Sequence, residues 1–316
     1  MFSTLKFPPQ KLIEVDGNRL LAIGVNGELQ LFNDVFESES DHKSPFPSPI
    51  VLSSVFENTL YACWIDLELL IARMAAITLD SNLSDGPSHA ELRINLANNS
   101  QVDVKGAIWS HILDAEPLGL VAGTKYVAFS TWKRGVYCIK HNSEELWRIP
   151  EIKWMNSLES VNIIASMEIT DEGLLIWSKG AEWVLLDGES GELLSRGEIE
   201  FDYVLEKVFT SKKRRLLCSS EGFVLWLDNL NSKNIETIEE KGPVHDAKWD
   251  PELQCWRLCL WRKDIMWSES ILEKYDRKDI GMAVFKHNDT WMVLDNSGKC
   301  SKHFPKNHSS SVAESP

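Results

Sequence analysis

Two cysteines lie close enough in the chain to share a metal ion. Cys255 and Cys259 are separated by three residues of an apolar stretch, and in a strand this spacing places both side chains on one face. Tetrahedral zinc needs two further ligands, which the sequence does not nominate. We therefore predict buried structural thiols here and free thiols at the remaining cysteines, Cys63, Cys138, Cys218 and Cys300.

A pair of carboxylates is the second candidate for chemistry. Asp66 and Glu68 flank Leu67, with Arg73 nearby. Paired carboxylates perform acid–base catalysis when one of them is desolvated. The pattern favours a turn with solvated charges. A helix over Leu60 to Leu79 is a rival interpretation, because apolar residues there are nearly continuous.

Motifs of nucleophilic catalysis and of cofactor binding are absent from the sequence. There is no GxSxG elbow, no catalytic-cysteine signature, no P-loop and no GxGxxG fingerprint. Histidines are expected in loops or near the tail (His42, His89, His303, His308) and near strand ends, where they bond backbone groups (His111, His141, His245, His287). We therefore expect a non-enzymatic protein without catalytic residues, cofactor, metal site or small-molecule ligand.

The charge balance limits the partners. A net charge of −14 argues against nucleic-acid binding, which depends on Lys and Arg. The basic run Lys212 to Arg215 is expected to be a solvated loop, with a nuclear-import signal or an anionic contact as the alternative. Leu60 to Leu79 is the longest apolar run but contains three charges, and the N-terminus lacks a secretory apolar stretch. These features predict a soluble, cytoplasmic protein without a membrane-spanning segment.

The elements that position these residues are recurring hairpins. Each has an apolar strand, a tight polar turn and a second apolar strand, and most end in Asp or Asn. Glycines in the turns, such as Gly27, Gly180 and Gly222, accept positive φ, and aromatic and β-branched residues fill the strands. The seven candidates are Leu20–Asn33, Leu60–Met74, Tyr126–Asn142, Leu174–Asp187, Arg215–Asn229, Trp256–Ser270 and Met282–Asp295.

Additional short strands complete four-stranded units. One follows some hairpins, as at Gly191–Leu194, and one precedes others, as at Val244–Trp249. Four strands per unit at steps of about 40 to 48 residues predict an all-β propeller of about seven blades, with six or eight as alternatives. The hairpins starting near residues 60 and 126 are too far apart, which predicts an insertion or a degenerate unit. Those near 256 and 282 are too close, so the last blade is expected to borrow Lys11–Val15 and close the ring.

The other segments follow from this architecture. We expect one propeller domain over residues 1–304, with loop insertions near 34–49 and 78–106 and a disordered tail over 305–316. Glu37–Pro49 and Ser81–His89 are interpreted as mobile loops. Eight tryptophans of the hairpins are expected to pack between blades: Trp64, Trp132, Trp177, Trp183, Trp226, Trp261, Trp267 and Trp291.

Several segments resemble known propeller repeats. Asn26–Asn33 and Glu221–Asp228 resemble the second hairpin strand of WD40-type repeats, and Gly242–Pro251 resembles the start of a WD40 blade. Leu185–Leu194 is also similar to quinoprotein (PQQ-type) repeats. The Gly-His pair and the closing Trp-Asp are missing from nearly every unit, so the resemblance extends to the broad group and to no family within it.

The resemblance implies a scaffold that holds other proteins on its faces. We expect a protein–protein interaction subunit or adaptor with a partner of unknown identity, bound on the loops of one face that include the insertion around Thr78 to Gly106. The alternative is a hydrolase- or lactonase-like enzyme or a ligand-binding protein, with carboxylates or metal ligands converging on the central channel. A quinoprotein enzyme would need a cofactor funnel and a calcium site, and the sequence identifies neither.

Overall fold

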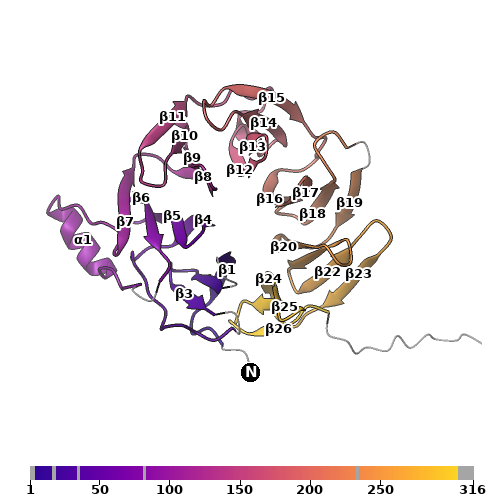
Figure 1. Ribbon diagram of the computed structural model, residues 1–316, viewed down its shortest axis with the longest axis horizontal. Coiled ribbons are helices and arrows are strands. Elements are labelled where there is room, and N and C mark those ends of the chain that lie inside the picture. Colours follow the sequence, from indigo (N-terminus) through magenta and orange to yellow (C-terminus); the bar gives the residue numbers. More distant parts are fainter. Residues whose placement is uncertain (1–3, 16–18, 34–35, 81–82, 233–234, 305–316) are drawn as a thin grey trace, which may run out of the picture.

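Seven antiparallel sheets form a closed ring in the computed structural model, which describes residues 4–15, 19–33, 36–80, 83–232 and 235–304 (Figure 1). The protein is thus an all-β propeller of seven blades, as predicted. Five blades have four strands, while the first and the last have three regular strands each.

In every blade the strands follow chain order from the channel outward. The innermost strands are β1 (Pro9–Val15), β4 (Ile50–Phe56), β8 (Pro117–Ala122), β12 (Ile164–Thr170), β16 (Leu205–Ser211), β20 (Val244–Asp250) and β24 (Gly281–His287). The second strands are β2 (Arg19–Gly24), β5 (Thr59–Asp66), β9 (Val127–Thr131), β13 (Gly173–Ser178), β17 (Arg214–Ser219), β21 (Cys255–Leu260) and β25 (Thr290–Asp295).

The outer half of each blade is shorter or more exposed. The third strands are β3 (Leu29–Phe32), β6 (Ile71–Thr78), β10 (Gly135–Ile139), β14 (Glu182–Leu186), β18 (Phe223–Leu227), β22 (Lys263–Trp267) and β26 (Cys300–Lys302). The outermost strands are β7 (Ala107–Leu113), β11 (Glu145–Ile149), β15 (Leu193–Glu198), β19 (Ile235–Glu239) and β23 (Leu272–Asp276). A 3₁₀ turn covers Glu159–Val161.

Because successive strands alternate in direction, two kinds of connection emerge on one side of the ring. These are the turns between second and third strands and the links from one blade to the next, and we call this side the link face. The predicted turn glycines Gly27 and Gly222 lie here with φ of 88° and 104°. A Cβ at either would overlap a backbone oxygen, which explains the glycine. In the Lys179–Gly180 turn the residue with positive φ is Ala181.

Tryptophans and aliphatic residues fill the spaces between blades. Trp64 and Trp177 are fully buried, as predicted for hairpin tryptophans, and Trp256 is fully buried as well. Trp226 packs edge-on against Trp249 and Trp267 between blades five and six, at centroid distances of 5.7 and 5.5 Å. The prediction is wrong for two tryptophans in link-face turns, Trp132 and Trp261, which are 40% and 53% exposed.

Residues 60–79 form β5 and β6, which confirms the hairpin predicted over Leu60–Met74 and excludes the rival helix. One detail of chain order differs from the sequence-based expectation. The last blade does not borrow residues 11–15, because these belong to β1, which pairs with β2 in the first blade. The hairpins that start near residues 256 and 282 are close together because the last one consists of β24 and β25, the first and second strands of its blade. The other six hairpins consist of second and third strands.

The ring is closed by side chains and one backbone contact. Leu5 and Phe7 precede β1 and are buried with residues of blades one and seven, including Phe32, Phe285 and Leu294. The N–H of Leu5 donates to the carbonyl of Gly298 at 2.9 Å. Within the described part of the chain, the seam between the first and last blades is therefore closed by an apolar cluster, and no strand there is shared between the two blades.

The two insertions pack against each other rather than forming free loops. Residues 36–49 continue blade one, through bridges that pair Leu29 with Lys43 and Phe32 with Ser38. The insertion between β6 and β7 contains α1 (His89–Ala97), and it contributes buried side chains to a core that includes Phe46 and Trp64. Within the described ranges, residues 37–49 and 83–89 are anchored to neighbouring segments, and their mobility stays a prediction. The predicted tail, 305–316, lies outside the described residues.

No helix among the described residues is both long enough and apolar enough to cross a bilayer; α1 has nine residues.

Candidate functional site

The cysteine pair is structural. Cys255 and Cys259 are both buried in β21, in agreement with the prediction. Burial raises the pKa of Cys255 to about 11 and that of Cys259 well above its usual value, so neither forms a thiolate readily. Among the described residues, no three His, Cys, Asp or Glu side chains come together in a way that would hold a metal ion.

The carboxylate pair is split between two environments. Glu68 is exposed and pairs with Arg93 of α1, whereas Asp66 is 5% exposed, so the prediction of two solvated charges is wrong for Asp66. Burial alone would raise the pKa of Asp66, but hydrogen bonds from Leu69, His89 and Ser48 outweigh it and hold the pKa low. This carboxylate is therefore an ionised acceptor that fixes the turn.

The basic run is also partly structural. Lys212 and Lys213 are exposed, as expected of a loop. Arg215 is buried and pairs with Glu168 at 2.6 Å, and the guanidinium of Arg214 lies over the Trp249 ring at 4.3 Å. Only half of the run is available to an anionic partner.

The histidines have mixed environments. His141 bonds Tyr61 and the carbonyl of Thr124 near a strand end, in the manner predicted. His303 was expected near the tail, but it is buried. Its Nδ1 accepts from Arg257, since Arg can only donate, and its Nε2 donates to the carbonyl of Leu258. His308 lies outside the described residues.

The central channel contains a cavity of about 800 Å³. Each innermost strand carries one irregularity at the same place, where a single residue is skipped in the pairing with the second strand. This bulge turns two successive residues of every blade toward the channel. The bulged residues form one ring: Gln10, Val51, Leu118, Ala165, Glu206, His245 and Met282. The residues that follow form a second ring: Lys11, Leu52, Gly119, Ser166, Lys207, Asp246 and Ala283.

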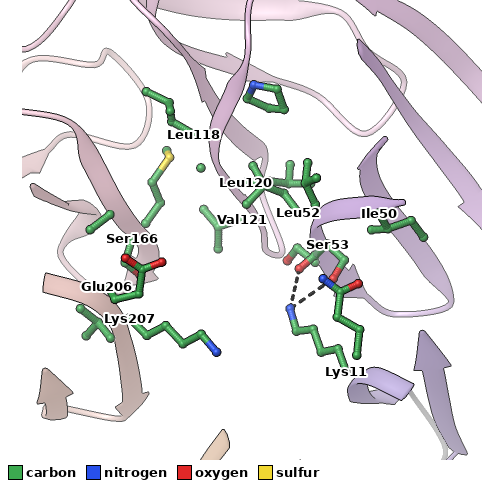
Figure 2. Close-up of a pocket in the computed structure, with 18 of the residues that line it drawn as sticks. Lys11, Ile50, Leu52, Ser53, Leu118, Leu120, Val121, Ser166, Glu206 and Lys207 are labelled. Carbon is green, nitrogen blue, oxygen red and sulfur yellow. Dashed lines mark hydrogen bonds between the residues drawn. The ribbon is translucent and has the colours of Figure 1, made fainter. Parts of the chain in front are cut away.

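The two rings divide the channel into a polar and an apolar sector. Blades one, five and six contribute polar side chains at both levels, and blades two and three contribute apolar side chains or glycine. Figure 2 shows Lys207 extending across the channel toward Lys11, with Leu52, Leu118 and Leu120 along another part of the wall.

Lys11 and Lys207 have only neutral hydrogen-bond partners. Lys11 donates to the carbonyl and the hydroxyl of Ser53 at 3.0 and 3.2 Å, and Lys207 lies 3.4 Å from the carbonyls of Val244 and His245. No carboxylate in the described part of the chain lies within 4.0 Å of either ammonium group. The other channel lysines, Lys179 and Lys248, have carboxylate partners, Glu206 and Glu14.

Enclosure shifts the titration of the polar sector. Water reaches Lys11 through the channel, yet the surrounding protein lowers its pKa to about 8. Asp246 opposes this shift, while the positive charges of Lys207 and Lys248 add to it. Burial raises the pKa of Asp246, whose carboxylate accepts from the N–H groups of Ala247 and Val284 at 3.0 and 2.9 Å.

The link face carries exposed apolar side chains at blades three and four, which we call the apolar rim. Trp132 lines both the channel and a small adjoining hollow beneath the link 150–163. This link exposes Met155 and Leu158, which are 53% and 62% accessible. It is held down by the buried carboxylate of Glu182, which accepts from the N–H groups of Met155 and Asn156 at 2.6 Å each.

Comparison with solved structures identifies the type of propeller. The chain is similar to the WD40 β-propeller domain of Doa1, with a TM-score of 0.64, 11% identity and coverage of 95% of this chain and 93% of that one. The protein has the WD40 β-propeller fold.

Two further structures superpose to a similar degree on this WD40 propeller. The Cps50 (Swd1) propeller domain of Myceliophteria thermophila has a TM-score of 0.65 at 8% identity, and the match covers 94% of this chain and 96% of that domain. The computationally designed Ika8 protein has a TM-score of 0.64 at 7% identity, with coverage of 95% and 96%. No protein-family model and no curated protein sequence matches the chain. The quinoprotein resemblance remains a prediction.

The channel lysines were not singled out from the sequence, and Trp132 was assigned to packing between blades instead of to an exposed surface. Lys11 and Lys207 follow Gln10 and Glu206 in strands that read as ordinary alternating segments. The sequence nevertheless contains a usable signal. The innermost strands of the blades can be aligned with one another by their distance along the chain from the following hairpin. Such an alignment would have placed Lys11, Lys207 and Asp246 at one level.

Proposed function

We propose that this protein is a non-enzymatic scaffold of the cytoplasm that binds protein partners on its link face, as a subunit or adaptor of a larger complex. The carrying observation is that Trp132, Met155 and Leu158 are exposed apolar side chains on the link face, and that Glu182 fixes the backbone at Met155. Exposed aromatic and aliphatic side chains on a rigid support are typical anchors of protein interfaces. In this proposal residues 1–304 act as one domain and 305–316 as a tail.

A second apolar site on the same face extends the proposed surface toward the inserted helix. Leu67 and Leu70 in the β5–β6 turn are 82% and 87% exposed. The Asp66–His89 and Glu68–Arg93 contacts tie this turn to α1. A partner that covered both the rim and this turn would also contact the insertion, as the sequence-based hypothesis anticipates.

The test is recovery of a partner from extracts of the source organism by immobilised protein. We expect a stoichiometric partner to be lost with a Trp132→Ala, Leu158→Asp double variant, which changes exposed side chains only. The matched control is Leu253→Asp, because Leu253 is 57% exposed in the β20–β21 turn on the opposite face. Leu67→Asp reports separately on the contribution of the insertion side.

Reconstitution of the purified pair and chromatography of the complex then decide the proposal. A one-to-one complex with the native protein and Leu253→Asp, absent with the double variant, supports it. Equal binding to all variants, or loss with Leu253→Asp alone, would contradict the assignment of the link face. Recovery of no stoichiometric partner would contradict the scaffold function.

The side chains that could bind a metal ion in the channel give less support to the alternative, a hydrolase-like enzyme. Glu206, His245 and Asp246 reach the channel, but Lys11, Lys207 and Lys248 lie among them. Positive charges beside these donors oppose the binding of a metal cation. The channel chemistry favours an anionic ligand.

A further inference from the structure

We propose that the central channel binds a small organic monoanion with an apolar body, of the aliphatic carboxylate class. Its charged end would pair with Lys11 and Lys207, and its body would lie along Leu52, Leu118 and Leu120. This ligand site goes beyond the scaffold function and does not depend on it.

The first argument is the charge of the polar sector. Two ammonium groups point into the channel with neutral oxygens as their only partners, and Asp246 is the remaining charged group at the same level. Across the whole channel, four lysines face three carboxylates, Glu116, Glu206 and Asp246, which leaves an excess of about one positive charge. A monocarboxylate would balance most of this excess without adding a second negative charge beside Asp246.

The second argument is that the other channel charges are already compensated. Lys179 pairs with Glu206 at 3.7 Å, and Lys248 pairs with Glu14 at 3.6 Å. Among the described channel residues, Lys11 and Lys207 are therefore the lysines that have no carboxylate partner. Both lysines belong to the second ring of channel residues, Lys11 on blade one and Lys207 on blade five. An anion between them would therefore be contacted from two sides.

The third argument concerns shape and apolar surface. A cavity of about 800 Å³ lies within the usual range of small-molecule sites, roughly 300–1,000 Å³. The wall on blades two and three carries Leu52, Leu118, Leu120 and Val121 (Figure 2). A fully hydrophilic anion would leave this wall against water, whereas an alkyl chain would cover it. The division of the channel into two sectors therefore selects an amphipathic ligand over inorganic phosphate.

The test uses isothermal titration calorimetry of the full chain with octanoate. Acetate and inorganic phosphate supply charge without an apolar body, and octan-1-ol supplies the body without charge. We expect one octanoate per protein, with acetate, phosphate and octanol binding at least tenfold more weakly. Lys11→Met and Lys207→Met should each weaken octanoate binding about tenfold, the loss expected for one charge-assisted contact. Lys302→Met, which removes an exposed lysine from β26, should leave it unchanged.

The lysine variants should remain folded. Lys11 and Lys207 are water-accessible side chains that line the channel, so replacing either with Met removes no core packing. A folded Lys11→Met, Lys207→Met double variant that binds octanoate like the native protein would overturn the proposal. So would octanol binding as tightly as octanoate, phosphate binding more tightly than octanoate, or the absence of octanoate binding at millimolar concentration. Partner recovery by the Lys207→Met variant separates this result from the scaffold proposal, because Lys207 lies inside the channel.

Discussion

Asp66 and His89 join blade two to the helix inserted within it. The Nε2 of His89 lies 2.8 Å from the Asp66 carboxylate, although the two residues are 23 positions apart. The same carboxylate accepts from the Ser48 hydroxyl at 3.1 Å and from the N–H of Leu69 at 2.8 Å. One buried side chain therefore fixes a turn, a link between blades and the start of α1.

Replacing Asp66 with Ala should destabilise the fold. The change leaves the donors of Ser48, Leu69 and His89 without their acceptor, so we expect a loss of about 2–4 kcal/mol in the free energy of unfolding. Urea denaturation measures it. Glu68→Ala is the matched control, because this carboxylate is exposed and should cost less than about 0.5 kcal/mol. Equal effects of the two changes would show that Asp66 has no special structural role.

Replacing Glu182 with Gln should loosen the link 150–163 without unfolding the ring. The charged acceptor of the Met155 and Asn156 N–H groups becomes a neutral amide, and these hydrogen bonds weaken. We expect amide hydrogen exchange in the link to accelerate, while exchange in β13 and β14 changes little. Glu159→Gln, at an exposed position of the same link, serves as the comparison. Unchanged exchange at Met155 and Asn156 would contradict the role given to Glu182.

The pH dependence of stability should carry a contribution from His303. Burial, reinforced by the charges of Arg257 and Arg277, lowers its pKa to about 3 from an ordinary value of 6.5. Between these values the unfolded chain binds a proton that the folded chain does not, so stability falls as the pH decreases below 6.5. Relative to His303→Gln, the native protein should lose up to about 1.4 kcal/mol per pH unit. Parallel stability curves from pH 7 to pH 4 would refute a neutral buried His303.

The seam between the first and last blades should be sensitive to Phe7. This side chain is 5% exposed and packs in the cluster that joins blades one and seven. Phe7→Ala should cost about 3–5 kcal/mol in the free energy of unfolding, since it leaves a cavity at the closure. Val25→Ala changes a half-exposed residue of the next turn and should have little effect. A Phe7→Ala protein as stable as the Val25→Ala protein would mean that residues 4–8 are dispensable for closure.

The architecture was predictable because each hairpin repeats a local pattern. Apolar strands around Gly27 and Gly222 specify second and third strands without reference to the rest of the chain. Ring closure was not predictable in the same way. Lys11–Val15 has the pattern of a strand, but pairing with β2 rather than with the last blade depends on the short separation along the chain and on burial of Leu5 and Phe7.

The candidate site was less accessible to sequence reasoning for a physical reason. A side chain faces the channel because of a bulge in the pairing of two strands, and a bulge leaves no fixed residue type in the sequence. Lys207 and Lys212 look equally solvated in the printed chain, yet one lies in the channel and the other on an exposed turn. Likewise Trp132 and Trp177 belong to similar hairpins. Trp132 is exposed because it lies in the turn, and Trp177 is buried because it lies within a strand.

Closure by packed side chains has a mechanical consequence. In rings where one strand is shared between both ends, tension on the termini must shear a whole row of hydrogen bonds at once. Here, among the described residues, Leu5 and Gly298 form the one backbone hydrogen bond across the seam. Resistance of the ring to opening at this place therefore comes from burial of the apolar cluster around Phe7 and not from a row of hydrogen bonds.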